Sequence, residues 1–476
     1  MHPRDALDPD IVLQALDARD ARFDGVFFVG ITTTQIYCRP VCPSRVARRD
    51  HRRIFPTAAA AESSGYRPCL RCRPELAPGR APCDAVARLA YAAAYRISTG
   101  ALNGQAVARI AADLGVSERH LRRAVQREMG VSPLQLAQTH RLLLAKRLLA
   151  DTTLPITTVA YASGFQSLRR FNSVFHERYG MSPTALRRPA ERKQEKDFIA
   201  LTLAYRAPLA WDTLVDLLRR EAITGLEVIE GMRYGRTVLV DGRRGVVFVE
   251  DDGRRVKLSV SLSLVPVLMP LLARLRNLLD LDAEPATIDA CLAQGGLASL
   301  VEQRRGLRLI GAFEGFELAF RALLTGSARP GTPASELAGR VVSSVGEPID
   351  TGIPSLTHLA PTAERMLNAA PELIALGVPP VLAEAIAAVA RLQLEPGGDA
   401  AATREALLSI DGIDEELATT IIMRTLRWPD AFPSSDAALQ GAADCSDASS
   451  LLEAAEAWRP WRAYAALHLW LSGTRT

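Results

Sequence analysis

Two close pairs of cysteines, Cys38-x3-Cys42 and Cys69-x2-Cys72, lie near the amino end of the chain, separated by a loop of 26 residues. Two sulfurs from one tight turn can reach the same metal ion, and two such pairs can close a tetrahedral zinc site. Two pairs within 35 residues are far more specific than one isolated pair. The spacing predicts a zinc ion held by all four cysteines, and by itself it favours a structural zinc over a reactive zinc thiolate.

Charge is distributed unevenly along the 476 residues. Residues 1–196 carry 31 Lys and Arg against 17 Asp and Glu, whereas the remainder carries 26 basic and 36 acidic side chains. The basic front part predicts a module that binds nucleic-acid phosphates. The acidic rear part is unexpected for a second DNA-binding module. A chain of this length predicts three or four domains.

The sequence also restricts the compartment. Clustered cysteines with Cys83, Cys291 and Cys445 left over fit a reducing cytosol better than a disulfide framework. The amino-terminal segment is polar and lacks the apolar core of a secretory signal, and no run approaches the ~18 apolar residues of a membrane span. We therefore expect a cytoplasmic, nucleoid-associated protein without membrane contact.

The segments around the cysteines, Thr32–Pro43 and Gly65–Glu75, closely resemble the amino-terminal domain of the Ada family of DNA-repair sensors. The resemblance implies that Cys38 is both a zinc ligand and the nucleophile that takes a methyl group from a methylated DNA phosphate, once per molecule. A zinc-bound thiolate stays deprotonated at neutral pH, and the thiolate is the nucleophilic form. Methylation lowers the negative charge of the cluster and can therefore switch DNA affinity. The resemblance also implies contacts with the DNA backbone from Thr34, Arg39, Arg45 and Arg67.

Between about residues 84 and 188 one helical unit occurs twice, about 50 residues apart. Ile110–Ser117 precedes a basic helix at Glu118–Glu128, and Val159–Ser167 precedes a helix at Leu168–Arg178. Both units contain Ala-x3-Gly, which places a small residue at the helix crossing and a glycine where a left-handed turn is needed. The repeat predicts a pair of helix-turn-helix units.

This stretch, including its end at Phe171–Pro183, resembles the AraC-type DNA-binding domain. That family lays two recognition helices into successive major-groove turns on one face of the DNA. Phe171 and Phe175 are four residues apart, so we expect them in the core rather than at the DNA. The predicted DNA-contacting residues are Arg119, His120, Arg122 and Arg123 on the first recognition helix and Gln166, Ser167, Arg169, Arg170 and Asn172 on the second.

The third part of the chain follows a polar linker at Pro189–Lys196. Apolar runs alternate with turns over residues 198–262, and Asp241-Gly242 and Asp252-Gly253 are typical hairpin turns. This pattern predicts a small antiparallel sheet with one or two helices. From about Val265 the pattern is helical to the last residue.

Two segments near the carboxyl end, Ala431–Leu439 and Ala457–Tyr464, closely resemble the AlkA-type 3-methyladenine glycosylases, with similarity from about Phe198 onward. The resemblance implies that the Asp436 carboxylate stabilises the oxocarbenium-like centre formed when an alkylated purine leaves its deoxyribose. The base must first be flipped out of the duplex, and an aromatic face, here Trp470, holds its positive charge. From its immediate neighbours alone, Asp436 reads as a helix N-cap.

The same family uses a helix-hairpin-helix turn, Gly-Ile-Gly, that points backbone N–H groups at a DNA phosphate, and Gly412 opens that turn here. The chain departs from the family pattern at four positions. Asp414 replaces the second glycine, Ser327 replaces an apolar wedge, and Glu416 and Thr420 replace aromatic pocket walls. Two hypotheses remain: the rear half excises N-alkylated purines, or it keeps the glycosylase fold without catalysis.

The sequence thus predicts a multidomain α+β protein. It combines a small four-cysteine zinc α/β domain at 1–80, an all-α double helix-turn-helix at 84–188, a small antiparallel sheet with helices at 197–305, and an all-α helix-hairpin-helix glycosylase domain at 306–476. The predicted function is an alkylation-damage response: methyl transfer to Cys38, transcription activation and 3-methyladenine-type base excision. The predicted partners are double-stranded DNA and RNA polymerase. The Pro-Cys-His-Arg segment of guanine O6-methyltransferases is absent, so we expect no such activity.

Overall fold

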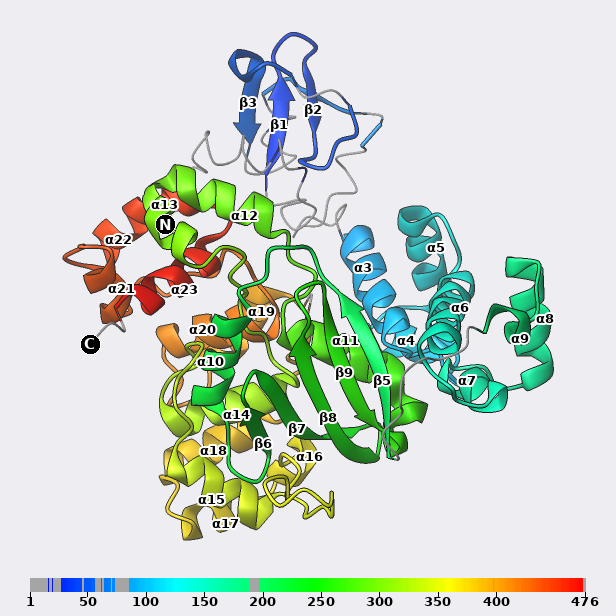
Figure 1. The fold of residues 1–476 in the computed structure, drawn as a ribbon. Coiled ribbons are helices and arrows are strands. Elements are labelled where there is room, and N and C mark those ends of the chain that lie inside the picture. Colours follow the sequence, from blue (N-terminus) through cyan, green and yellow to red (C-terminus); the bar gives the residue numbers. More distant parts are fainter. Residues whose placement is uncertain are drawn as a thin grey trace.

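The structure is a computed structural model in which three regions follow one another along the chain (Figure 1). A small sheet comes first, a helical region second, and a larger sheet surrounded by helices third. Predictions for Arg45, Cys83 and the linker at Pro189–Lys196 fall outside the described residues. The described residues are 27–44, 47–55, 64–69, 71–72, 85–187, 197–396 and 398–473, with the single positions 16, 19 and 61.

The first sheet has the strand order β3-β1-β2-β4. Its elements are β1 (Phe28–Ile31), β2 (Ile36–Cys38), the 3-10 turn η2 (Arg49–His51), β3 (Arg52–Phe55) and β4 (Arg67–Pro68). Strand β1 pairs antiparallel with β2 and β3, whereas β2 and β4 run parallel. Aromatic rings hold the sheet together, because Phe28 packs edge-on against Tyr37 and Phe55 against Tyr66.

The second region contains the predicted repeat. Its helices are α3 (Ala85–Ser98), α4 (Val107–Asp113), α5 (Glu118–Met129), α6 (Pro133–Asp151), α7 (Ile156–Ala162), α8 (Leu168–Tyr179) and α9 (Pro183–Leu186). Ser117 and Ser167 cap α5 and α8, which end at left-handed glycines. The glycines in the turns before these two helices, Gly115 and Gly164, also have positive φ. At Gly164, an added Cβ would lie 2.2 Å from Asn103 Oδ1. The predicted pair of helix-turn-helix units is confirmed.

The third region begins with a sheet of strand order β5-β9-β8-β7-β6, in which every neighbouring pair is antiparallel. Its strands are β5 (Phe198–Ala204), β6 (Glu227–Glu230), β7 (Arg233–Val240), β8 (Arg243–Asp251) and β9 (Arg255–Ser261), with helix α10 (Trp211–Glu221) between β5 and β6. The predicted turn at Asp241-Gly242 joins β7 to β8, and both of its residues have positive φ. The sequence pattern therefore predicted this sheet correctly.

Helices follow the sheet to the carboxyl end. They are η5 (Leu262–Val267), α11 (Leu268–Leu278), α12 (Pro285–Leu292), the π-helical turn η6 (Ala293–Leu297), α13 (Ala298–Gln303), α14 (Gly315–Thr325), α15 (Glu336–Val345), α16 (Ala363–Met366), α17 (Ala370–Ala375), α18 (Pro380–Val389), α19 (Ala400–Leu408), α20 (Glu415–Thr425), α21 (Ala437–Ala442), α22 (Ala448–Ala455), η7 (Glu456–Trp458) and α23 (Arg462–Ser472). Helices α14 to α20 share one apolar core.

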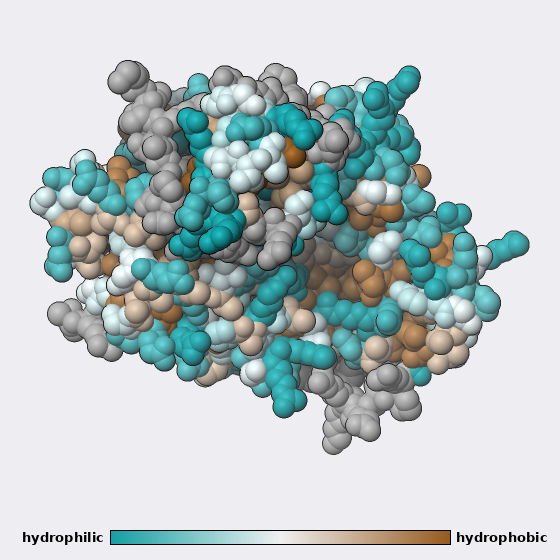
Figure 2. All heavy atoms as spheres, turned by 90° about the horizontal axis from the view of Figure 1, so that it is seen from above, coloured by the Kyte–Doolittle hydropathy of each residue, from teal (hydrophilic) through white to brown (hydrophobic). Residues whose placement is uncertain are grey.

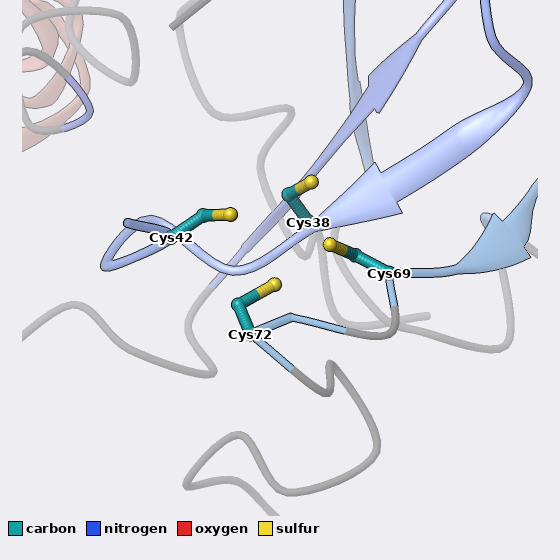
Figure 3. Close-up of side chains that lie close together, drawn as sticks. All are labelled: Cys38, Cys42, Cys69 and Cys72. Carbon is teal, nitrogen blue, oxygen red and sulfur yellow. The ribbon is translucent and has the colours of Figure 1, made fainter. Parts of the chain in front are cut away.

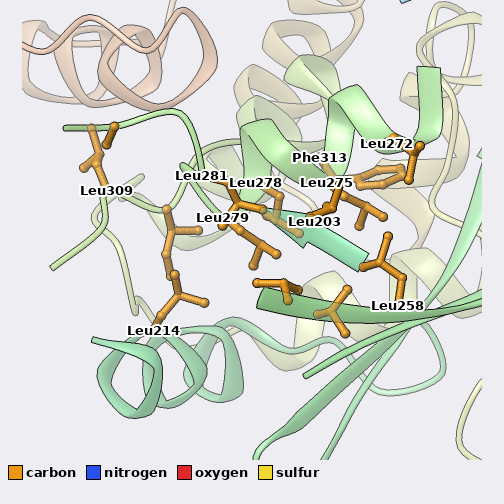
Figure 4. Close-up of a cluster of buried hydrophobic side chains, with 14 of the residues drawn as sticks. Leu203, Leu214, Leu258, Leu272, Leu275, Leu278, Leu279, Leu281, Leu309 and Phe313 are labelled. Atoms are coloured by element: carbon orange, nitrogen blue, oxygen red, sulfur yellow. The ribbon is translucent and has the colours of Figure 1, made fainter. Parts of the chain in front are cut away.

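A second apolar core connects regions that are far apart in the sequence. Leucines of α11 pack on the strands of the large sheet, with Leu203 and Leu258 facing Leu272 and Leu275 (Figure 4). The same core includes Phe171 of α8, and the helical region meets the third region where α6 contacts β5 and α7 contacts η5. From the side of the small sheet, the molecule presents mainly hydrophilic side chains (Figure 2). Within the part of the chain that the structure describes, no helix is long and apolar enough to cross a membrane.

A buried ion-pair network joins α14 to the large sheet. Glu317 accepts hydrogen bonds from Arg236 Nη2 of β7 at 2.7 Å and from Arg321 Nη2 at 2.5 Å. Arg321 also pairs with Glu227 of β6, which accepts a hydrogen bond from the hydroxyl of Tyr234. Burial by itself would raise the pKa of Glu317, but the charges of the two arginines lower it to about 2. The carboxylate is therefore ionised in the folded protein.

We predict that Glu317→Gln lowers the free energy of unfolding by about 3 kcal/mol, because it leaves two buried guanidiniums without their shared anion. The contribution of Glu317 is present above the unfolded pKa of about 4.3 and is lost as the pH falls toward about 2. Urea unfolding at neutral and acidic pH measures both effects. The control Glu347→Gln removes an ion pair with Arg244 whose side chains are 52% and 55% exposed, and should change stability by less than about 0.5 kcal/mol. Equal losses in the two variants would contradict the prediction.

Candidate functional site

The four cysteines of the predicted metal site come together at one edge of the small sheet (Figure 3). All four Sγ atoms, of Cys38, Cys42, Cys69 and Cys72, lie within 4.8 Å of one another. Strand β2 ends at Cys38, and Cys69 directly follows β4. Because these strands run parallel with Tyr37 opposite Pro68, their carboxyl ends meet at the same edge. The parallel pairing thus brings together two cysteine pairs that are separated in sequence.

The donor set fits zinc. Hydrogen bonding with Cys42 and Cys72, together with burial, raises the pKa of Cys38 well above its usual range. Hydrogen bonding within the same cluster lowers the pKa of Cys42. Four thiolates this close together repel one another, so they need a cation to share this space. A tetrahedral zinc with zinc–sulfur bonds of about 2.3 Å separates the sulfurs by about 3.8 Å. The observed cluster, with its sulfurs within 4.8 Å, accommodates that geometry with a small contraction.

Cys38 is the most accessible member of the cluster. Its side chain is half-buried, whereas those of Cys42, Cys69 and Cys72 are at most 8% exposed. Among the four cysteines, Cys38 is therefore the residue that a reactant can approach with the least rearrangement.

The residues predicted to contact DNA near the cluster differ in exposure. Thr34 and Arg67 are exposed. Arg39 is buried, its Nη1 donates a hydrogen bond to Cys72 O at 3.1 Å, and its backbone N–H donates to Cys72 Sγ at 3.4 Å. Arg39 thus supports the second cysteine pair from within the domain, and its predicted contact with DNA stays a prediction.

The two predicted recognition helices present polar faces to solvent. On α5, Arg119, His120 and Arg123 are exposed, and Arg122 is half-buried because its Nε donates to Glu118 Oε1 at 2.7 Å. Phe171 and Phe175 are fully buried, so their predicted place in the core is confirmed. Ser167 also caps its helix, through the backbone N–H of Arg170. The predicted contacts of the second unit lie on its solvent side: Gln166, Ser167, Arg169, Arg170 and Asn172.

Asp436 is both a helix cap and the centre of a polar cluster. Its Oδ1 accepts hydrogen bonds from the backbone N–H groups of Ala438 at 2.7 Å and Leu439 at 3.1 Å, which begins α21. Its Oδ2 accepts a hydrogen bond from Trp470 Nε1 at 2.9 Å and lies 3.3 Å from Arg329 Nε. The carboxylate is 1% exposed, and Trp470 is also buried. The structure therefore brings the two predicted rear-site residues together.

The predicted hairpin turn lies between α19 and α20. Gly412 has φ +90° and is exposed, as a turn that offers backbone N–H groups requires. Asp414 caps α20, because its Oδ1 accepts a hydrogen bond from the backbone N–H of Leu417 at 2.8 Å. This cap gives a structural reason for a carboxylate at the position of the second glycine.

Two charged residues lie near Asp436 in positions that the sequence did not predict. Arg329 lies in the loop after α14 and pairs with Asp436. Glu416 is on α20, and its pKa is raised by burial and by the nearby Asp436 charge, while Arg329 lowers it. The only signal in the sequence was Glu416, a charged residue at a position where the resembled family has an aromatic one. Thr420 is buried and its hydroxyl donates to Glu416 O at 2.7 Å, so that donor is already used.

Comparisons with known families agree with this arrangement. Residues 12–75 match the metal binding domain of Ada, residues 110–189 a helix-turn-helix domain, and residues 200–314 the AlkA N-terminal domain. These stretches contain the cysteine cluster, both recognition helices and the five-stranded sheet.

Individual relatives extend the similarity along the chain. A protein of Mycobacterium tuberculosis described as a probable bifunctional transcriptional activator/DNA repair enzyme AlkA is 35% identical over 473 residues, which cover 96% of this chain and 95% of that protein. The DNA-3-methyladenine glycosylase 2 of Escherichia coli is 31% identical over 278 residues, covering 56% of this chain and 96% of that enzyme. The solved 3-methyladenine DNA-glycosylase from Archaeoglobus fulgidus superposes with a TM-score of 0.50 at 18% identity, over 58% of this chain and 98% of its own, and shows a shared fold.

We predict that the full-length protein contains about one zinc per chain and that Cys72→Ser loses it, because a hydroxyl cannot replace the thiolate ligand. Metal analysis of the purified variants by plasma mass spectrometry measures this. The matched control is Cys445→Ser, which removes a half-buried thiol outside the cluster and should leave the zinc content unchanged. Full zinc occupancy in Cys72→Ser would contradict the assignment.

Proposed function

We propose, because this chain belongs to the family of bifunctional transcriptional activator/DNA repair enzymes, that it couples a response to DNA alkylation with the removal of alkylated bases. The similarity to the Mycobacterium tuberculosis relative over 96% of the chain is the observation that carries this conclusion, because it includes both sites. The front half would sense methylated DNA phosphates and activate transcription. The rear half would act as a 3-methyladenine-type DNA glycosylase.

In the sensor reaction, Cys38 Sγ attacks the methyl carbon of a methyl phosphotriester. A sulfur–carbon bond forms, the carbon–oxygen bond breaks, and the oxygen leaves with its electron pair as part of a normal phosphodiester. Zinc held by the four cysteines would keep their thiols deprotonated at neutral pH. The half-buried position of Cys38 supports this role over the three more deeply buried cysteines. The thioether formed at Cys38 does not release its methyl group at neutral pH, so each molecule reacts once.

The charge change supplies the switch. Methylation removes one negative charge from the cluster and so reduces its repulsion from DNA phosphates. The exposed Thr34 and Arg67 would then approach the backbone, together with Arg39 and Arg45. Helices α5 and α8 would contact the operator in the major groove. The DNA-bound protein would then recruit RNA polymerase. We propose that this takes place in the cytoplasm, at the nucleoid. The domain units we propose are 1–80, 84–188, 197–305 and 306–476.

In the excision reaction, the Asp436 carboxylate stabilises positive charge on the deoxyribose as the N-glycosidic bond breaks. The bonding electrons leave with the base, and water adds to the sugar. Trp470 Nε1 and the α21 N–H groups hold the carboxylate in one orientation. The Gly412 turn would bind a DNA phosphate while the damaged base is flipped out.

A second candidate function is a transcriptional activator whose rear half keeps the glycosylase fold without catalysis. The contact of Arg329 with Asp436 favours it, because a paired carboxylate that is 1% exposed cannot reach a sugar without rearrangement. Ser327 and Asp414 at the departures from the family pattern point the same way.

We predict that incubation with DNA containing methyl phosphotriesters adds one methyl group to Cys38, because it is the most accessible sulfur of the cluster. Peptide mass spectrometry locates the modification, and Cys38→Ala should abolish it. Cys445→Ala serves as the control and should be methylated at Cys38 as in the unchanged protein. Methyl transfer to Cys69 would overturn the assignment of the nucleophile.

We predict that the protein releases 3-methyladenine from alkylated duplex DNA and that Asp436→Asn lowers the rate by about 100-fold or more, because it removes the stabilising charge. Asparagine is as good an N-cap as aspartate, so α21 should persist. The matched control is Asp447→Asn, which removes the charge from the exposed N-cap of α22 and should leave release unchanged. Equal background release by the unchanged protein and Asp436→Asn would support the second candidate function.

A further inference from the structure

The loop after α14 holds Arg329 in place by hydrogen bonds on several sides. The backbone N–H of Arg329 donates to Ser327 Oγ at 3.1 Å, and its carbonyl accepts from Thr332 Oγ1 at 2.8 Å. Arg424 Nη1 of α20 donates to Ala328 O at 3.0 Å, and Glu221 Oε1 accepts from the backbone N–H of Gly331 at 2.7 Å. These contacts fix the loop backbone, so the direction of the Arg329 side chain toward Asp436 is built into the fold.

Arg329 is nevertheless the displaceable partner of Asp436. The other donors to this carboxylate are two backbone N–H groups of α21 and the indole of buried Trp470. The Arg329 side chain, by contrast, is 36% exposed, and its long side chain can rotate into solvent. Among the described polar partners of Asp436, the Arg329 guanidinium is therefore the one that can move away most readily.

A second carboxylate lies on the same side of the site. Glu416, Thr420 and Arg424 are spaced four residues apart and so share one face of α20. Arg424 binds the loop at Ala328, which places this face against the segment that carries Arg329. Glu416 is half-buried there, and its pKa, raised by burial and then by the Asp436 charge, reports the same proximity. Asp436 thus pairs with Arg329 directly, and Glu416 lies close enough to feel the charge of the same guanidinium.

We propose that Arg329 and Glu416 determine which lesions enter the excision site: the Arg329 guanidinium occupies the place of a positively charged base beside Asp436 and Glu416, and a cationic N-alkylated purine displaces it. A cationic base restores the charge balance of the two carboxylates after Arg329 has moved. A neutral damaged base leaves them without a cation, which is unfavourable in a partly buried site. This inference rests on the proposed excision function.

Substitutions of the two residues should have different effects. Arg329→Ala removes the competing cation, so cationic and neutral bases should both bind about tenfold more tightly and the preference between them should stay the same. Glu416→Gln removes one negative charge and so weakens the attraction of the site for the Arg329 guanidinium and for a cationic base alike. Neutral bases should therefore bind better, and the preference for cationic bases should fall about five- to tenfold.

The test uses the full-length protein and short duplexes with a 2′-fluoro sugar at the lesion, which resists cleavage. One duplex carries 7-methylguanine, a cationic base, and the other carries hypoxanthine, a neutral one. Fluorescence anisotropy gives each affinity relative to an undamaged duplex of the same sequence, which cancels the binding of the front half. Arg340→Ala is the control, because it removes an exposed arginine on α15 and should change neither ratio.

Two results would overturn the inference: an unchanged preference in Glu416→Gln, or weaker relative binding of both lesion duplexes in Arg329→Ala. Release of 7-methylguanine from the cleavable duplex by the unchanged protein is measured in parallel. Release without the predicted binding pattern contradicts the inference and leaves the proposed function standing. The binding pattern without release supports the inference and contradicts the excision function.

Discussion

The buried ion-pair network of Glu317, Arg236, Arg321 and Glu227 anchors α14 to the five-stranded sheet. The loop that follows α14 carries Arg329, and helix α20 closes on it through Arg424. Because breaking a buried ion pair is strongly destabilising, this network holds in place the helix that leads into the Arg329 loop. The sheet is thus joined to α14 by ion pairs, in addition to apolar packing elsewhere in the third region.

The front site depends on a different constraint, the parallel pairing of β2 and β4. Parallel strands place their carboxyl ends side by side, so the pairing of β2 with β4 brings Cys38 and Cys69 together. Cys42 and Cys72 complete the cluster because each lies within one tight turn of its partner. Two short strands therefore bring Cys38, the proposed nucleophile, into the four-cysteine cluster.

Much of the architecture could be predicted from local patterns. The Ala-x3-Gly repeats predicted two helix-turn-helix units, and alternating apolar runs predicted the five-stranded sheet, because both depend on side-chain periodicity. The fourfold spacing of Phe171 and Phe175 predicted their burial. The positions of Arg329 and Glu416 near Asp436 could not be predicted in this way, because the two residues are 87 positions apart on separate elements and no local periodicity relates them.

The sequence alone determined the chemistry available to the protein: four thiols with zinc spacing, two basic recognition helices and an aspartate within a family-like segment. Only the tertiary structure decided which of these groups are accessible and which are paired with other charges. It showed Cys38 as the most accessible thiol, Arg39 buried against Cys72, and Asp436 paired with Arg329. Residue type and spacing are local properties, whereas accessibility and charge pairing depend on which distant elements pack together.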